Sequence, residues 1–109
     1  MSMRLHGKVA IVTGGAHGMG EAEARLFARE GATVVVADIL PELGEAVAAD
    51  ICAEGQTAMF HRIDVSQEPE WQALIAATLA AYGRIDVLVN NAGISGSAVG
   101  DPDAIEGWN

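Results

Sequence analysis

The chain has 109 residues and a mass of 11.3 kDa, which is enough for one domain built around one core. Half of the residues are hydrophobic and the mean hydropathy is +0.25, so an intrinsically disordered chain is disfavoured. Six basic residues against fifteen acidic ones give a formal charge of -9, and a field of that sign repels nucleic-acid backbones and anionic lipid.

The sequence contains no signal for membrane insertion or export. No apolar run approaches the roughly 18 residues that a membrane-spanning helix needs. The apolar run at residues 9–12, which follows Arg4 and Lys8, is too short for the core of a signal peptide. The single cysteine, Cys52, cannot form an internal disulfide, which is typical of a reducing compartment. We therefore expect a cytoplasmic protein that binds neither nucleic acid nor a membrane.

Short β-branched runs alternate with longer helical patterns along the chain. The runs that predict strands are residues 8–13, 33–37, 57–63 and 85–89, and continuous apolar runs are typical of strands covered on both faces. The patterns that predict helices are residues 21–30, 41–54 and 67–82. Each expected helix is followed by a glycine, which suits a helix C-terminus: Gly31, Gly55 and Gly83.

Apolar residues at helical spacing predict the buried face of each helix. For the first helix these residues are Ala22, Leu26 and Phe27, and for the second they are Leu43, Val47 and Ile51. The third helix has the most regular pattern: Trp71, Leu74, Ile75, Thr78, Leu79 and Tyr82. We expect Cys52 to be a small apolar filler on the second helix. Ser66 is expected to cap the third helix, with Pro69 in its first turn.

The order of these elements predicts the fold. Short strands joined by helical crossovers imply a parallel sheet with right-handed connections. We therefore expect an α/β fold of the doubly wound, Rossmann-like type, incomplete, with strand order 3-2-1-4. Residues 1–109 are expected to form a single domain.

A glycine cluster lies between the first strand and the first helix. Gly14, Gly18 and Gly20 have the spacing G-x-x-x-G-x-G. In such a loop one glycine permits a sharp turn, another lets the backbone approach a pyrophosphate, and a third lets the helix pack closely on the strand. The N-terminus of the helix presents unpaired N–H groups and a partial positive charge to an anion. The pattern predicts a diphosphate site, and the alternative is an ordinary tight turn between a strand and a helix.

Asp38 ends the second strand, eighteen residues after Gly20, where a carboxylate that binds the ribose of a dinucleotide belongs. An ionised carboxylate accepts hydrogen bonds from the ribose hydroxyls, and its repulsion of a 2′-phosphate costs on the order of several kcal/mol. Ile39 supplies no cation to offset that repulsion, and His17 is mostly uncharged near neutral pH. These residues favour NAD over NADP, and the alternative for Asp38 is a solvated carboxylate at a strand end.

Together, these motifs resemble the short-chain dehydrogenase/reductase family. The resemblance covers residues 4–93, in the family's order and spacing, and within it residues 7–40 look most similar to NAD-dependent hydroxysteroid or secondary-alcohol dehydrogenases. Met19 replaces the family's commonest isoleucine, which is a volume-conserving change. The motifs that carry the resemblance are Thr13-Gly14-x-x-x-Gly18-x-Gly20, Asp38, Asp64-Val65 and Asn90-Asn91-Ala92-Gly93.

The resemblance implies a role for each matching position. Asp64 would accept a hydrogen bond from the adenine amino group, and the backbone N–H of Val65 would meet a ring nitrogen. Asn90 would brace the sheet, while Ala92 and Gly93 would keep a loop thin beside the cofactor ribose. The alternatives are a helix-capping Asp-Val-Ser turn and a plain glycine turn. The full set of expected cofactor-binding residues is Gly14, Ala16, His17, Gly18, Met19, Gly20, Asp38, Ile39, Asp64, Val65, Asn90, Ala92 and Gly93.

The family's catalytic residues have no counterpart in this sequence. The resemblance implies a Tyr-x-x-x-Lys pair, in which the lysine lowers the pKa of the tyrosine so that it can exchange a proton with the substrate oxygen. The only tyrosine here is Tyr82, the residue four positions on is Asp86, and the only lysine is Lys8. We therefore expect no catalytic residue in these 109 residues, and the spacing of the histidines and Cys52 predicts no metal site.

The sequence thus predicts the nucleotide-binding part of an NAD-dependent oxidoreductase, truncated before its catalytic Ser/Tyr/Lys region and inactive alone. Only a full-length form would bind an alcohol or ketone substrate or assemble into a homo-oligomer. Two alternatives remain: a stand-alone module that binds or senses NAD without chemistry, and a flavodoxin-like or receiver-type signalling domain. The glycine loop and Asp38 fit the signalling domain poorly, because a receiver clusters acidic residues around a metal.

Overall fold

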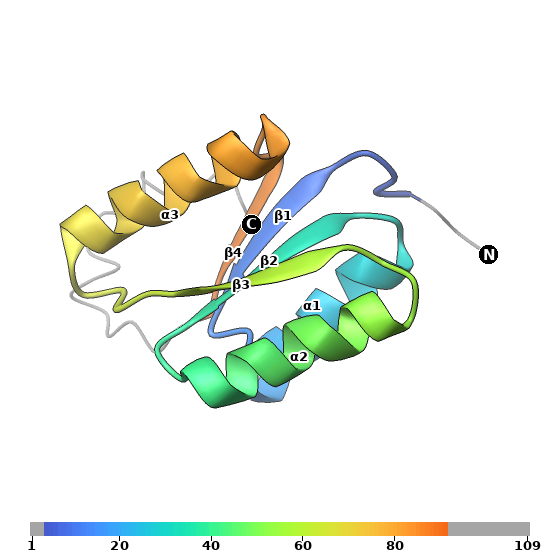
Figure 1. The fold of residues 1–109 in the computed structure, drawn as a ribbon, viewed down its shortest axis with the longest axis horizontal. Helices are drawn as coiled ribbons and strands as arrows, with labels where there is room; N and C mark the ends of the chain where they lie inside the picture. Colours follow the sequence, from blue (N-terminus) through green and yellow to red (C-terminus); the bar gives the residue numbers. More distant parts are fainter. Residues whose placement is uncertain (1–3, 92–109) are drawn as a thin grey trace.

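The computed structural model describes residues 4–91, which form a four-stranded sheet and three helices. The order of elements is β1 (Val9–Thr13), α1 (Gly18–Arg29), β2 (Thr33–Asp38), α2 (Pro41–Ala53), β3 (Ala58–Arg62), α3 (Glu68–Tyr82) and β4 (Val87–Asn90). All neighbouring strands pair in parallel, in the order β3-β2-β1-β4. This arrangement, visible in Figure 1, confirms the predicted fold class and strand order.

The helices cover both faces of the sheet. Figure 1 shows α1 and α2 together on one face and α3 on the other. Successive residues of a strand point to opposite faces, so the central strands β1 and β2 contribute to two separate cores. Val12 packs with the α1–α2 side, whereas Ile11 packs with the α3 side beside Leu74. This burial on both faces explains why β1 and β2 are continuous apolar runs.

Two of the predicted helix faces are partly wrong. On α1, Ala22 and Leu26 face away from the core, and the side chain of Leu26 is 49% exposed. On α2, Val47 and Ile51 are buried as expected, but Leu43 is 51% exposed. The buried residues of α1 are small: Gly20, Ala24 and Ala28. Small side chains let a helix approach the sheet closely, and they contribute little to a pattern of large apolar residues.

The third helix starts later than predicted and is capped differently. Its N-cap is Gln67, whose side chain makes no capping hydrogen bond, so the expectation that Ser66 caps α3 is wrong. Ser66 instead donates its hydroxyl to the side chain of Asp64, which draws it away from the helix. The apolar stripe of α3 is largely inward, since Leu74 and Thr78 are buried, but Leu79 is 45% exposed. Cys52 is exposed, so its expected role as a buried filler is also wrong.

The fourth strand is fastened to the first at its start. The backbone N–H of Val9 donates to the Asp86 carboxylate at 2.8 Å, and the Asp86 N–H donates to the Val9 carbonyl at 2.8 Å. The Arg84 guanidinium and then the Val9 N–H hold the pKa of the Asp86 carboxyl below its usual value. These contacts fix the register of β4, and because all strands are parallel, their carboxyl ends lie at one edge of the sheet. Across the described residues, no helix is long and apolar enough to cross a membrane.

Candidate functional site

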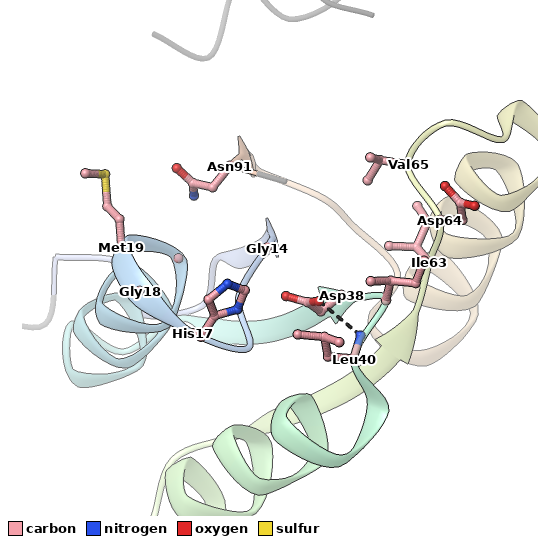
Figure 2. Close-up of a pocket in the computed structure, with 12 residues that line it drawn as sticks. Gly14, His17, Gly18, Met19, Asp38, Leu40, Ile63, Asp64, Val65 and Asn91 are labelled. Atoms are coloured by element: carbon pink, nitrogen blue, oxygen red, sulfur yellow. Dashed lines mark hydrogen bonds between the residues drawn. The ribbon is translucent and has the colours of Figure 1, made fainter. Parts of the chain in front are cut away.

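A pocket of about 630 Å³ lies at the carboxyl ends of the strands. This volume falls within the range of about 300–1,000 Å³ that is typical of small-molecule sites. Doubly wound sheets bind ligands outside the carboxyl ends of their strands, where the strand order reverses. Figure 2 shows the residues that line the pocket, which are Gly14, His17, Gly18, Met19, Gly20, Asp38, Ile39, Leu40, Ile63, Asp64, Val65 and Asn91.

The glycine loop forms one wall of the pocket and ends in the first turn of α1. Gly14 and Gly18 adopt positive φ angles of 66° and 62°, which favour glycine. At Gly20, a Cβ atom would lie 2.0 Å from the Gly14 carbonyl oxygen, so any side chain there would collide with backbone. His17 occupies the N-cap of α1 and makes no side-chain capping bond. The start of α1 therefore lies close to the loop, with the arrangement that binds phosphate groups at helix N-termini.

Asp38 connects the glycine loop to the end of β2. Its side chain is buried at 5% exposure, and its Oδ2 atom accepts the Ala16 N–H at 3.0 Å. Its Oδ1 atom accepts the Leu40 N–H at 3.0 Å, as drawn in Figure 2. Ala16 is buried and is not part of the pocket lining, so its contribution is the hydrogen bond that its N–H donates to Asp38. Asp38 thus holds the loop in place while forming part of the pocket.

The loop between β3 and α3 forms the opposite wall. Asp64 Oδ1 accepts the Ser66 N–H at 3.0 Å and the Ser66 hydroxyl at 2.6 Å. The Ser66 hydroxyl, followed by the Ser66 N–H, lowers the pKa of the Asp64 carboxyl from its usual value. Figure 2 shows the Val65 side chain turned toward the pocket and the Asp64 carboxylate turned toward the start of α3. The Asp-Val-Ser turn is therefore present, but it does not cap α3, and Asp64 also lines the pocket.

The end of β4 reaches the pocket through Asn91. Asn90 Oδ1 accepts the Thr13 hydroxyl at 2.7 Å, which is the brace between strands that the resemblance implies. The Asn91 N–H donates to Thr13 Oγ1 at 3.1 Å, and its side-chain amide donates to the Glu23 carboxylate on α1. Asn90 is not part of the pocket lining, whereas Asn91 is.

Most of the residues predicted from the sequence come together in this pocket. The ones that line it are Gly14, His17, Gly18, Met19, Gly20, Asp38, Ile39, Asp64 and Val65. Ala16 and Asn90 act from outside the lining, and Ala92 and Gly93 lie outside the described residues. Sequence reasoning missed Leu40, Ile63 and Asn91, although each is the sequence neighbour of a predicted residue.

Other chemistry is not apparent at this site. Within residues 4–91, no group of three or more His, Cys, Asp or Glu side chains lies close enough to hold a metal ion. Tyr82 is not among the residues that line the pocket, and burial raises the pKa of its hydroxyl. The pocket combines the start of a helix, which favours an anion, with the carboxylate of Asp38, which accepts hydrogen bonds.

The amino-acid sequence is similar to a known protein family and to dehydrogenases within the curated proteins. A model of the family described as short chain dehydrogenase matches residues 8–107. The chain is 46% identical to 2,5-dichloro-2,5-cyclohexadiene-1,4-diol dehydrogenase LinX of Sphingobium indicum over 109 residues, which are 100% of this chain and 44% of that protein. It is 44% identical to 3-alpha-(or 20-beta)-hydroxysteroid dehydrogenase of Mycobacterium tuberculosis over 108 residues, which are 99% of this chain and 40% of that protein.

A solved structure shares the fold. The crystal structure of hydroxysteroid dehydrogenase from Escherichia coli matches with a TM-score of 0.80 and 42% sequence identity, over 84% of this chain and 37% of that one. The chain therefore spans less than half the length of each of these relatives.

Proposed function

Because the chain belongs to the short-chain dehydrogenase family, we propose that it is the nucleotide-binding part of an NAD-dependent oxidoreductase. The residues present fit a dinucleotide, since a close-packed glycine loop, an uncapped helix start and a buried carboxylate line one pocket. In such an enzyme the bound nicotinamide supplies the hydride chemistry that interconverts a secondary alcohol and a ketone.

The observation that carries the choice of NAD is the position of Asp38. Its carboxylate lies at the pocket beside the glycine loop, where it would accept hydrogen bonds from the hydroxyls of the adenosine ribose. A 2′-phosphate at that place would meet a buried carboxylate, and like charges in close contact cost several kcal/mol. The neighbouring Ile39 offers no compensating positive charge.

The remaining parts of the proposal follow from the family. This chain would show no dehydrogenase turnover, because it lacks a Tyr-x-x-x-Lys pair. A longer form would take a small alcohol or ketone substrate and assemble as a homo-oligomer. We place the protein in the cytoplasm, where an exposed thiol such as Cys52 stays reduced.

The test is a comparison of NADH with NADPH by titration calorimetry on the 109-residue chain. We expect NADH to bind at least about tenfold more tightly than NADPH. Ile39 is exposed, so an Ile39→Arg variant can place a cation beside the expected 2′-phosphate. This change should raise the affinity for NADPH and thereby reduce the preference for NADH over NADPH.

Asp38→Ala gives the second arm of the test. Removing the carboxylate should reduce both the affinity for NADH and the preference over NADPH. Glu42→Ala, which removes an exposed carboxylate from the first turn of α2, is the matched control and should change neither. Equal affinity of the unsubstituted chain for the two dinucleotides, or no binding of NADH, would contradict the proposal.

A further inference from the structure

The loop between β3 and α3 is held by a nearly complete set of backbone hydrogen bonds. The Ile63 N–H donates to the Asp38 carbonyl at 3.0 Å, and the Gln67 N–H donates to the Asp64 carbonyl at 3.0 Å. The Ser66 N–H is bound by the Asp64 carboxylate. Within the described part of the chain, the Val65 N–H is the one backbone donor of residues 63–67 that makes no hydrogen bond. Because Val65 lines the pocket, this donor is available to a ligand.

Two side chains from the first turn of α3 hold the groups on either side of that donor. The Asp64 N–H donates to Glu70 Oε1 at 2.6 Å. The indole N–H of Trp71 donates to the Val65 carbonyl at 2.8 Å. Arg62 approaches the same Glu70 oxygen at 3.4 Å, so the carboxylate is also held from β3. The backbone of Asp64 and Val65 is therefore fixed from outside the pocket by residues that do not line it.

We propose that Glu70 and Trp71 are positioning residues that set the base selectivity of the nucleotide pocket. This inference rests on the proposed function, because it assumes that a dinucleotide occupies the pocket. Glu70 and Trp71 touch no ligand themselves. They hold the groups on either side of the free Val65 N–H, so that this donor is presented to a flat base in one fixed direction.

The chemistry of this donor defines the base that fits. The Val65 N–H only donates hydrogen bonds, whereas the Asp64 carboxylate is turned toward the start of α3 and is bound by Ser66. Adenine offers the complementary group, a ring nitrogen that accepts a hydrogen bond. Hypoxanthine carries a hydrogen on that ring nitrogen, so it would oppose a donor to the Val65 N–H.

The experiment measures the ratio of two dissociation constants, for NADH and for reduced nicotinamide hypoxanthine dinucleotide. The unsubstituted chain should prefer NADH by about tenfold, as expected when a polar pair is mismatched. Trp71→Phe keeps an aromatic ring of similar packing but removes the indole donor, and we expect the preference to fall to about threefold or less. A general loss of stability would weaken both affinities alike and leave their ratio unchanged.

Glu70 supplies a second pair of variants. Glu70→Ala removes the acceptor for the Asp64 N–H and should also lower the ratio, whereas Glu70→Gln keeps an oxygen at that place and should restore most of it. Glu68→Ala removes an exposed carboxylate from the same turn of α3 and is the matched control for the change of charge. Its ratio should equal that of the unsubstituted chain.

Two results would overturn the inference in distinguishable ways. In the first result, the unsubstituted chain binds NADH, and the Trp71→Phe and Glu70→Ala variants have the same ratio of dissociation constants as the unsubstituted chain. Glu70 and Trp71 then do not set the base selectivity, and the proposed function stands. If the unsubstituted chain binds neither dinucleotide, the proposed function fails and this inference fails with it.

Discussion

The two walls of the pocket are built on different principles. The glycine loop and the start of α1 owe their shape to atoms that are missing, since a Cβ at Gly20 would overlap the Gly14 carbonyl. The loop between β3 and α3 owes its shape to polar side chains, since Ser66, Glu70 and Trp71 hold the Asp64–Val65 segment through hydrogen bonds. The first wall should therefore be broken by adding atoms, and the second by removing polar groups.

Gly20→Ala should have the largest effect. The added methyl group would lie 2.0 Å from a backbone oxygen, which no rotation of a side chain can relieve. Overpacking costs about 1 to 3 kcal/mol and occasionally more, and a collision with backbone lies at the upper end of that range. We expect urea denaturation to show that loss, and NADH binding to disappear with it. An unchanged midpoint of unfolding would mean that the two segments can separate without penalty.

Asp38→Ala should have the second largest effect, because the Asp38 carboxylate is the side chain that accepts the buried Ala16 N–H of the glycine loop. The change leaves the Ala16 N–H buried without its partner, and such a loss costs about 2 to 3 kcal/mol. Asp38→Asn keeps one oxygen acceptor, so its stability should lie between that of the Asp38→Ala variant and that of the unsubstituted chain. Thermal unfolding checks the order, and equal stability of the Ala and Asn variants would contradict it.

Gly18→Ala tests the cost of an unfavourable backbone conformation without the steric collision that is expected at Gly20. Nothing lies within 4 Å of the added Cβ, but φ at this position is 62°, and the left-handed conformation costs an L-residue about 1 to 2 kcal/mol. The variant should therefore be destabilised less than Gly20→Ala, although the two positions lie in the same turn. The ratio of the two losses in urea denaturation measures how much of this wall depends on close approach.

The smallest expected effect is the pH dependence of the stability that Asp64 contributes in the loop between β3 and α3. The pKa of Asp64 is lowered in the folded protein, chiefly by the Ser66 hydroxyl. A lowered folded pKa stabilises the fold above the unfolded value of about 3.9, and this contribution is lost as the pH falls through the folded pKa. Asp64→Asn should be less stable than the parent near pH 7, and its stability should approach that of the parent as the pH falls through the folded pKa of Asp64. A constant difference across this range, in unfolding free energies measured by urea, would contradict the assignment.

The fold was predictable because its strongest signals are local. The apolar runs of β1 and β2 and the glycines after the helices are enough to give the alternation of strands and helices. Helix faces were harder to predict, because α1 buries small residues such as Ala24 and Ala28 while the larger Leu26 is exposed. A pattern of large apolar residues does not reveal a buried face that is made of small ones.

The site could be predicted where the spacing of residues in a motif is itself required by the structure. Gly14, Gly18 and Asp38 were identified by spacing, and they lie together at the pocket. Asn91 was missed as a lining residue because its place depends on contacts with Thr13 and Glu23, which no spacing reveals. The misplacement of Ser66 as a helix cap has a similar cause, since the same hydroxyl can serve a helix or a nearby carboxylate.

The strand order has a consequence for synthesis on the ribosome. One edge of β1 pairs with β2, which is complete once residue 38 has emerged, but the other edge pairs with β4, which begins only at residue 87. Through the intervening translation, the central strand exposes a row of unpaired N–H and carbonyl groups on that edge. Open edges of this kind recruit other chains. The nascent chain is therefore vulnerable to aggregation until β4 has emerged.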